Sequence, residues 1–93
     1  MAILHLLNKP VLTHDASVDC FRSINKGDGL VLIEDGVYLT QRSAVARKNI
    51  AIYALQHDLH VRGLSPLQSH IRIIDDAEFV ELCTQYDKTI SWF

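Results

Sequence analysis

The sequence predicts one small α/β domain of the doubly wound type, with a mostly parallel sheet of four or five strands and helices on both faces. Continuously apolar runs alternate with amphipathic or polar segments, which is typical of parallel strands joined by helical crossovers. A chain of 93 residues has room for only one core. We therefore expect a single domain over residues 1–93.

Four apolar runs rich in branched side chains are the predicted strands. Each is continuous rather than alternating in hydrophobicity, as expected of strands covered on both faces. They span residues 3–7, 29–33, 50–55 and 71–74. The tail over 89–93 has strand-like composition and is predicted to add an edge strand.

The segment over residues 13–26 is a predicted helix. Thr13 or Asp15 is a suitable N-cap, and Gly27 is a suitable stop. The side chains of its inward stripe are Ser17, Cys20, Phe21 and Ile24. This helix is expected to cross over between the first two strands.

A second long helix is predicted over residues 76–86. Asp75 and Glu78 have the spacing of a capping box. Helical spacing places four side chains on one face, namely Phe79, Leu82, Cys83 and Tyr86. Shorter helical segments are expected over 40–48 and 58–62, the second ended by Gly63.

Composition excludes several classes of function. The formal charge of −2, with basic and acidic residues interspersed, predicts no direct nucleic-acid binding. No apolar run approaches the roughly 20 residues that span a bilayer, so a soluble cytoplasmic protein is expected. Neither glycine-rich phosphate-binding motif occurs, and no cofactor is expected.

A hydrophobic content of 48% in so short a chain favours assembly with partners.

In doubly wound sheets, ligands usually meet the loops that follow the strands. Here these loops are residues 8–10, 34–38, 56–58 and 75–76. His57 and His60 have a spacing that can ligate zinc, but two solvated histidines are the better interpretation and no metal is expected. Helix capping and turn geometry account for the four aspartates of these loops, Asp35, Asp58, Asp75 and Asp76.

Cys20 is the candidate nucleophile, because a thiolate can accept sulfur as a persulfide and pass it on. The position of Cys20 on the inward stripe of the predicted helix, however, predicts a buried side chain that serves packing. Arg22 and Lys26 are nearby in sequence and would favour a thiolate. Cys83, on the stripe of the last helix, is expected to serve core packing. The two cysteines lack the C-x-x-C spacing and are expected to form no disulfide, which fits a reducing compartment.

The order of several short motifs resembles the TusB/DsrH family of sulfur-relay subunits over nearly the whole chain. The matching pieces are Ile3-Leu4-His5 with Asn8-Lys9, Gly27-Asp28, Glu34-Asp35-Gly36-Val37-Tyr38, Tyr53-Ala54-Leu55, Asp58-Leu59, Arg62-Gly63, Ile74-Asp75, Phe79-Val80 with Leu82, and Ser91-Trp92. One departure is a shorter connection over residues 39–49. The resemblance implies a DsrE-like fold.

The resemblance also implies partners. They are TusC/DsrF-like and TusD/DsrE-like subunits in a heterohexamer, with a TusE-like protein as the sulfur acceptor. This chain would then be an accessory subunit of a sulfurtransferase complex that serves 2-thiolation of the tRNA wobble uridine. The alternative is a DsrH-like subunit of a sulfur-oxidation complex, in which Cys20 carries the persulfide.

Two further alternatives lie outside sulfur chemistry: a non-catalytic interaction module and a homo-oligomeric domain that binds a small molecule. Among the residues that match the family, structural roles suffice for His5, Asp35 and Asp58. Arg62 is expected to cap preceding carbonyls or to join an interface pair. Trp92 is expected to anchor a subunit contact.

Overall fold

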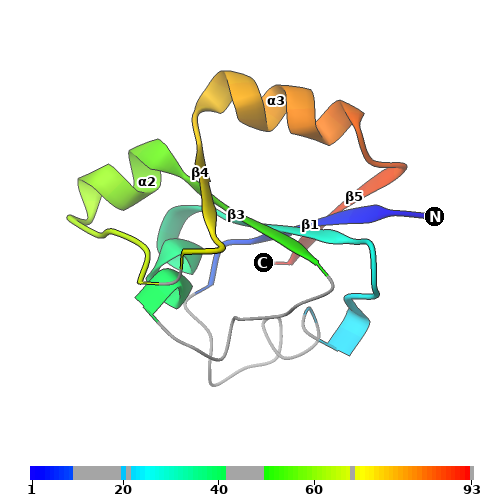
Figure 1. Cartoon of the computed structure of the whole chain (residues 1–93), viewed down its shortest axis with the longest axis horizontal. Coiled ribbons are helices and arrows are strands. Elements are labelled where there is room, and N and C mark those ends of the chain that lie inside the picture. The colour runs from blue at the N-terminus through cyan, green and yellow to red at the C-terminus, as the bar shows by residue number, and fades with distance from the viewer. Residues whose placement is uncertain (10–19, 21, 42–49, 68, 93) are drawn as a thin grey trace.

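The computed structural model describes residues 1–9, 20, 22–41, 50–67 and 69–92, and these contain one five-stranded parallel sheet, whose arrangement can be followed in Figure 1. The strands are β1 (Ile3–Leu7), β2 (Gly29–Leu32), β3 (Ala51–Leu55), β4 (Arg72–Ile74) and β5 (Lys88–Trp92). Their order across the sheet is β4-β3-β2-β1-β5, and every pairing is parallel. The predicted fold class is confirmed, and so is the edge strand at the tail.

Burial explains why the central strands are continuously apolar. All four residues of β2 are buried, because side chains on both of its faces pack against other elements. In β5, by contrast, every residue is exposed or half-buried. A strand with this pattern belongs at the edge of a sheet, where β5 pairs with β1 alone.

In the described part of the chain, helical segments follow β2, β3 and β4. They are η1, a 3-10 helix over Glu34–Gln41, α2 over Gln56–Val61, and α3 over Asp76–Thr84. The capping box at α3 is as predicted: Asp75 accepts from the Glu78 N–H at 2.8 Å, and Glu78 accepts from the Asp75 N–H at 3.0 Å. Gly63, with a φ of 65°, ends the α2 turn in the left-handed conformation that glycine favours.

The interpretation of residues 34–38 as a loop was wrong. They form the first part of η1, whose last turn is held by the Thr40 hydroxyl donating to the Val37 carbonyl at 2.7 Å. The predicted helix over 40–48 lies mostly outside the described residues. Of the predicted helix over 13–26, the structure describes Cys20, Arg22 and Ser23 as helical, with the chain turning at Gly27.

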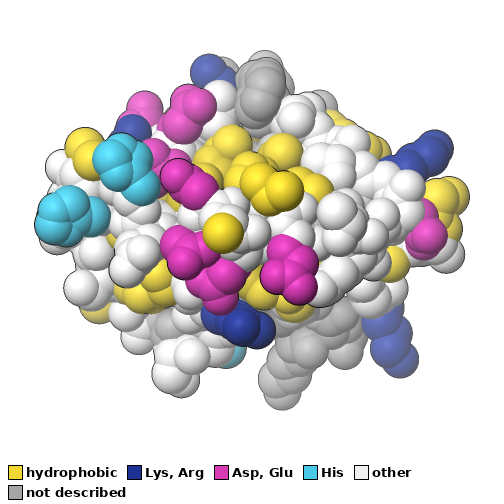
Figure 2. All heavy atoms as spheres, turned by 90° about the horizontal axis from the view of Figure 1, so that it is seen from above, with side chains coloured by type: hydrophobic (Ala, Val, Ile, Leu, Met, Phe, Trp, Pro, Cys, Tyr) yellow, Lys and Arg dark blue, Asp and Glu magenta, His cyan; other side chains and the backbone are white. Residues whose placement is uncertain are grey.

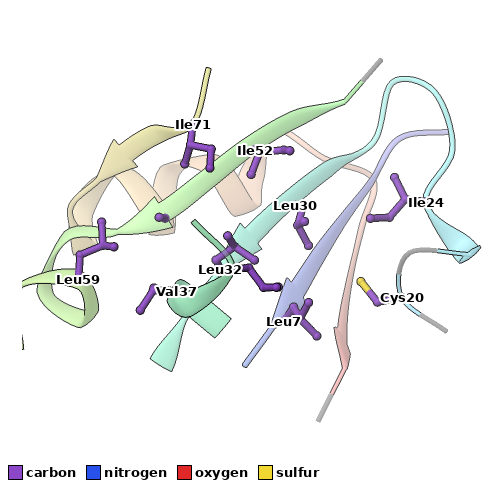
Figure 3. Packing of buried hydrophobic residues seen from close by; sticks show 11 residues of the cluster. Leu7, Cys20, Ile24, Leu30, Leu32, Val37, Ile52, Leu59 and Ile71 are labelled. Atoms are coloured by element: carbon purple, nitrogen blue, oxygen red, sulfur yellow. The ribbon is translucent and has the colours of Figure 1, made fainter. Parts of the chain in front are cut away.

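The sheet separates two apolar clusters. On one face, Cys20, Leu7 and Val37 belong to the larger cluster, with side chains from β1, β2, β3 and α2 (Figure 3). On the other face, α3 covers the smaller cluster with Phe79, Leu82, Cys83 and, just beyond the helix, Tyr86. The predicted inward face of the last helix, including the packing role of Cys83, is confirmed.

Tyr86 gives the smaller cluster a measurable response to alkali. Burial, together with the neighbouring Tyr53, raises the pKa of Tyr86 from 10.0 to about 12. The folded state therefore keeps this proton longer than the unfolded state, and stability falls as pH rises from 10 towards 12. We expect Tyr86→Phe to remove part of this alkaline loss, measured by urea denaturation at pH 8 and pH 11. Equal alkaline losses in the two proteins would contradict this assignment, and Tyr38→Phe, at an exposed position, is the control.

Candidate functional site

The guanidinium of Arg62 joins η1 to α2, the helical segments that follow β2 and β3. Its Nε and Nη2 donate to Asp35 Oδ1 at 3.1 and 2.9 Å, and its Nη1 donates to the Asp58 carbonyl at 3.1 Å. The bond to Asp35 raises the pKa of Arg62 above its ordinary value. The guanidinium also lies over the Tyr38 ring, 5.9 Å from its centroid. Arg62 thus caps a carbonyl as predicted, and it ties η1 to α2.

Asp58 has a different role from the one predicted. Helix α2 begins at Gln56 with Leu55 at its N-cap and no side-chain cap, so Asp58 does not cap it. Its Oδ2 instead accepts from the Glu34 N–H at 2.8 Å. Glu34 has a φ of 49°, a left-handed conformation that is strained for a residue with a side chain. This hydrogen bond to the Asp58 carboxylate holds the strained residue just beyond the end of β2.

His57 and His60 line a hollow of about 290 Å³ together with Gln56, Asp75 and Asp76. Figure 2, which views the α3 face, shows acidic side chains grouped beside exposed hydrophobic ones. Within the described part of the chain, no group of three or more histidine, cysteine or carboxylate side chains is arranged to hold a metal ion. The two imidazoles are exposed to solvent, as the sequence indicated.

Cys20 is fully buried, with 0% of its surface exposed, and belongs to the larger cluster. The burial predicted from its helical face is confirmed. Cys83 is half-buried against the other cluster. Neither thiol is in a disulfide. A donor persulfide therefore reaches Cys20 only after the surrounding packing moves.

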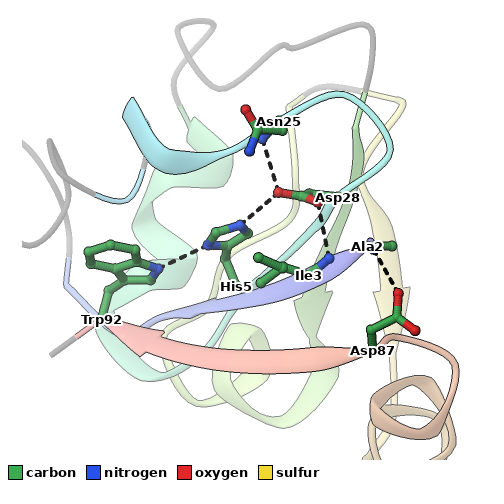
Figure 4. Close-up of polar contacts among 7 residues, drawn as sticks. All are labelled: Ala2, Ile3, His5, Asn25, Asp28, Asp87 and Trp92. Carbon is green, nitrogen blue, oxygen red and sulfur yellow. Dashed lines mark hydrogen bonds and ion pairs between the residues drawn. The ribbon is translucent and has the colours of Figure 1, made fainter.

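A buried polar network lies on the same face of the sheet as Cys20, and it was not predicted. His5, in the middle of β1, is 0% exposed, and its Nε2 lies 3.0 Å from Asp28 Oδ2 (Figure 4). Its Nδ1 accepts from the Trp92 indole N–H at 3.0 Å. A histidine inside an otherwise apolar strand was the available signal, because a buried imidazole needs polar partners. Trp92 thus has a partner within its own chain, and its expected subunit contact remains a prediction.

Asp28 is the centre of this network. Burial would raise the pKa of its carboxyl, but hydrogen bonds from the Asn25 N–H, His5 and the Ile3 N–H outweigh that effect. The net pKa is lowered from its ordinary value of 3.8. Asp28 is 2% exposed, so an ionised carboxylate is held here by three hydrogen bonds rather than by water.

Known proteins resemble this chain over almost its full length. A family model described as DsrH like protein matches residues 11–89. Protein TusB of Escherichia coli K12 is 34% identical over 97 residues, covering 97% of this chain and 100% of the relative. Protein TusB of Pectobacterium parmentieri is 28% identical over 97 residues, and the match again covers 97% of this chain and 100% of the relative.

The fold also matches a solved structure. The solution structure of protein Tm0979 from Thermotoga maritima superposes with a TM-score of 0.64 at 28% identity, covering 91% of this chain and 93% of that one. In the described part of this chain, no helix has the length and apolar character needed to cross a membrane. With the family model and the full-length match to TusB, these findings show that the chain belongs to the DsrH-like family that includes the TusB proteins.

Proposed function

We propose that this protein is an accessory subunit of a heterohexameric sulfur-relay complex. In this proposal the complex supports persulfide transfer for 2-thiolation of the tRNA wobble uridine, in the synthesis of 5-methylaminomethyl-2-thiouridine. The observation that carries the proposal is the match to TusB, which is 34% identical and extends over the relative's whole length. The protein works in the cytoplasm beside TusC/DsrF-like and TusD/DsrE-like subunits, and a TusE-like acceptor takes the sulfur.

The surface supports a role in an assembly. Several large hydrophobic side chains are exposed on a domain of only 93 residues, namely Tyr38, Val61, Leu67, Ile73 and Val80. Among the described strands, β4 and β5 lie at the two edges of the sheet, each with one side that no other described strand pairs with. Partner subunits of related fold would cover such features.

The first test is to purify the tagged chain gently from its own cells and to weigh the intact complexes by native mass spectrometry. We expect two further small α/β chains, in equal number with this one. A homo-oligomer of this chain alone would overturn the proposal, and it would favour a small-molecule-binding domain. Partners without a reactive cysteine would favour an interaction module outside sulfur chemistry.

A second candidate function is that of a DsrH-like subunit in sulfur oxidation, with Cys20 as the persulfide carrier. It is favoured by the match to the DsrH-like family model and by a cysteine on the first predicted helix. In this step the Cys20 thiolate attacks the outer sulfur of a donor persulfide. The new S–S bond forms on Cys20, the donor's S–S bond breaks, and the donor cysteine leaves as a thiolate.

Burial at 0% exposure predicts that Cys20 gains little sulfur from a persulfide donor in the isolated chain. The measurement is peptide mass spectrometry after exposure to the donor, on the isolated chain and on the complex. The half-buried Cys83 is the internal reference, and Cys20→Ser is the control for peptide assignment. Sulfur on Cys20 in the complex would support the carrier role, and its absence in both settings would exclude that role.

A further inference from the structure

The imidazole of His5 uses both of its ring nitrogens. Nε2 lies 3.0 Å from Asp28 Oδ2, and Nδ1 lies 3.0 Å from Trp92 Nε1. Figure 4 shows the imidazole between the carboxylate and the indole. The imidazole and indole planes are 20° apart, with ring centroids separated by 6.1 Å. The imidazole has no hydrogen-bonding position left for a third partner.

These two contacts fix the protonation state of His5. An indole N–H can only donate, so Nδ1 must offer its lone pair to Trp92. Nε2 therefore carries the single ring proton and donates it to Asp28, whose carboxylate also accepts from two backbone N–H groups. In this structure His5 is neutral and Asp28 is ionised.

A second proton on His5 has one place to bind, the Nδ1 lone pair that Trp92 occupies. With that proton in place, two N–H groups would face each other and the hydrogen bond would be lost. We propose that His5 is a proton-sensitive lock on the Trp92 side chain of the edge strand β5, in which proton binding at Nδ1 and release of the Trp92 indole are one event. The proposal is independent of the sulfur-relay function.

The bond to His5 holds the Trp92 side chain at the end of β5. At the start of the strand, the Ala2 N–H donates to Asp87 Oδ2 at 2.8 Å, and the Asp87 N–H donates to the Ala2 carbonyl at 3.0 Å. At its end, Trp92 lies opposite Leu7 and donates to His5. Because the backbone of β5 is paired with β1 from Lys88 to Trp92, loss of the indole bond releases the Trp92 side chain from His5 while the strand itself stays in place.

The described groups around His5 favour this response. Asp28, on the approach to β2, bonds to the ring and would pair with an imidazolium, so protonation weakens the link to Trp92 and not the link to Asp28. The other titratable groups on neighbouring described segments include the buried thiol of Cys20, the half-buried phenol of Tyr86, and the exposed side chains of Arg22, Lys26, Asp87 and Lys88. The exposed charges are screened by solvent and act weakly on the buried ring.

Trp92 is the only tryptophan of the chain, so its indole N–H resonance in an NMR spectrum shows directly whether the bond to His5 is present. We expect this resonance to move reversibly from its hydrogen-bonded position as pH falls from 8 to 5, while the far-UV circular dichroism is unchanged. His5→Gln should abolish the pH-dependent movement. His57→Gln, which replaces an exposed imidazole, should keep it. An indole resonance that does not move before the whole domain unfolds would overturn the proposal, as would an unchanged movement in His5→Gln.

Trp92→Phe gives a second readout that does not need His5 to be replaced. Without the indole N–H, a proton no longer competes with Trp92 for the Nδ1 lone pair, so Nδ1 should take up a proton more readily in this variant than in the wild type. The measurement follows the NMR resonances of the His5 ring as a function of pH, in the full-length wild type and in Trp92→Phe. An unchanged or lower midpoint in Trp92→Phe would overturn the proposal even if His5→Gln failed to fold.

Discussion

Replacing Gly36 with alanine is expected to destabilise the protein more than adding a methyl group at any other glycine. A Cβ at this position would collide with the carbonyl oxygen of Leu7 and lie 3.0 Å from its carbonyl carbon. These are backbone atoms at the end of β1, so they cannot turn aside as a flexible side chain would. Gly36 is also buried and donates to the Ile33 carbonyl at 2.8 Å, which fixes its place in η1.

We expect Gly36→Ala to lower the free energy of unfolding by about 3 kcal/mol or more, measured by urea denaturation. The matched control is Gly63→Ala. Gly63 has a φ of 65°, but a Cβ there would meet no atom within 4 Å, so only backbone strain of about 1 kcal/mol is expected. A loss in Gly36→Ala no larger than that in Gly63→Ala would show that the end of β1 yields to the added methyl group.

The elements that the sequence predicts well are those whose signals are local. The runs at 3–7 and 29–33 are continuously apolar because both faces of a central parallel strand are covered, and each forms a strand. The capping box of Asp75 and Glu78 is encoded by residues three positions apart. Such patterns need no knowledge of the rest of the fold.

The 3-10 helix η1 was mistaken for a loop because its stability comes from outside the segment. An acidic pair followed by Gly36 is typical of a turn. In the structure, however, its first residue is held by Asp58 of α2 and its second by Arg62, the residue that follows α2. Those contacts form only after the sheet places β2 beside β3.

The network of His5, Asp28 and Trp92 shows the same limit for the candidate site. Trp92 and His5 are 87 positions apart, and Asp28 and His5 are 23 apart. Their contact depends on the parallel register that sets His5 opposite Ile90 and Leu30. A histidine inside an apolar strand implies that a buried imidazole needs polar partners, but only the strand order β2-β1-β5 identifies them.

Replacing Asp28 with asparagine is expected to have the second large effect. The carboxylate accepts from the Ile3 N–H at 3.0 Å, the Asn25 N–H at 3.0 Å and His5 Nε2 at 3.0 Å. A carboxamide of the same size has one acceptor oxygen and an NH₂ group, which would face at least one of these donors. Since the site is 2% exposed, water cannot compensate, and we expect a loss of about 2–4 kcal/mol in the free energy of unfolding.

The pH dependence of this loss separates the charge of Asp28 from its shape. Because the folded-state pKa lies below the ordinary value of 3.8, the carboxylate stabilises the fold fully above that pH and progressively less as pH falls through the folded-state pKa. The difference between wild type and Asp28→Asn, measured by urea denaturation, should therefore shrink between pH 7 and pH 3. Asp76→Asn, at an exposed position in the first turn of α3, is the control and should change stability by no more than about 0.5 kcal/mol. A difference that is the same at both pH values would mean that the shape of the carboxylate, and not its charge, anchors the start of β1.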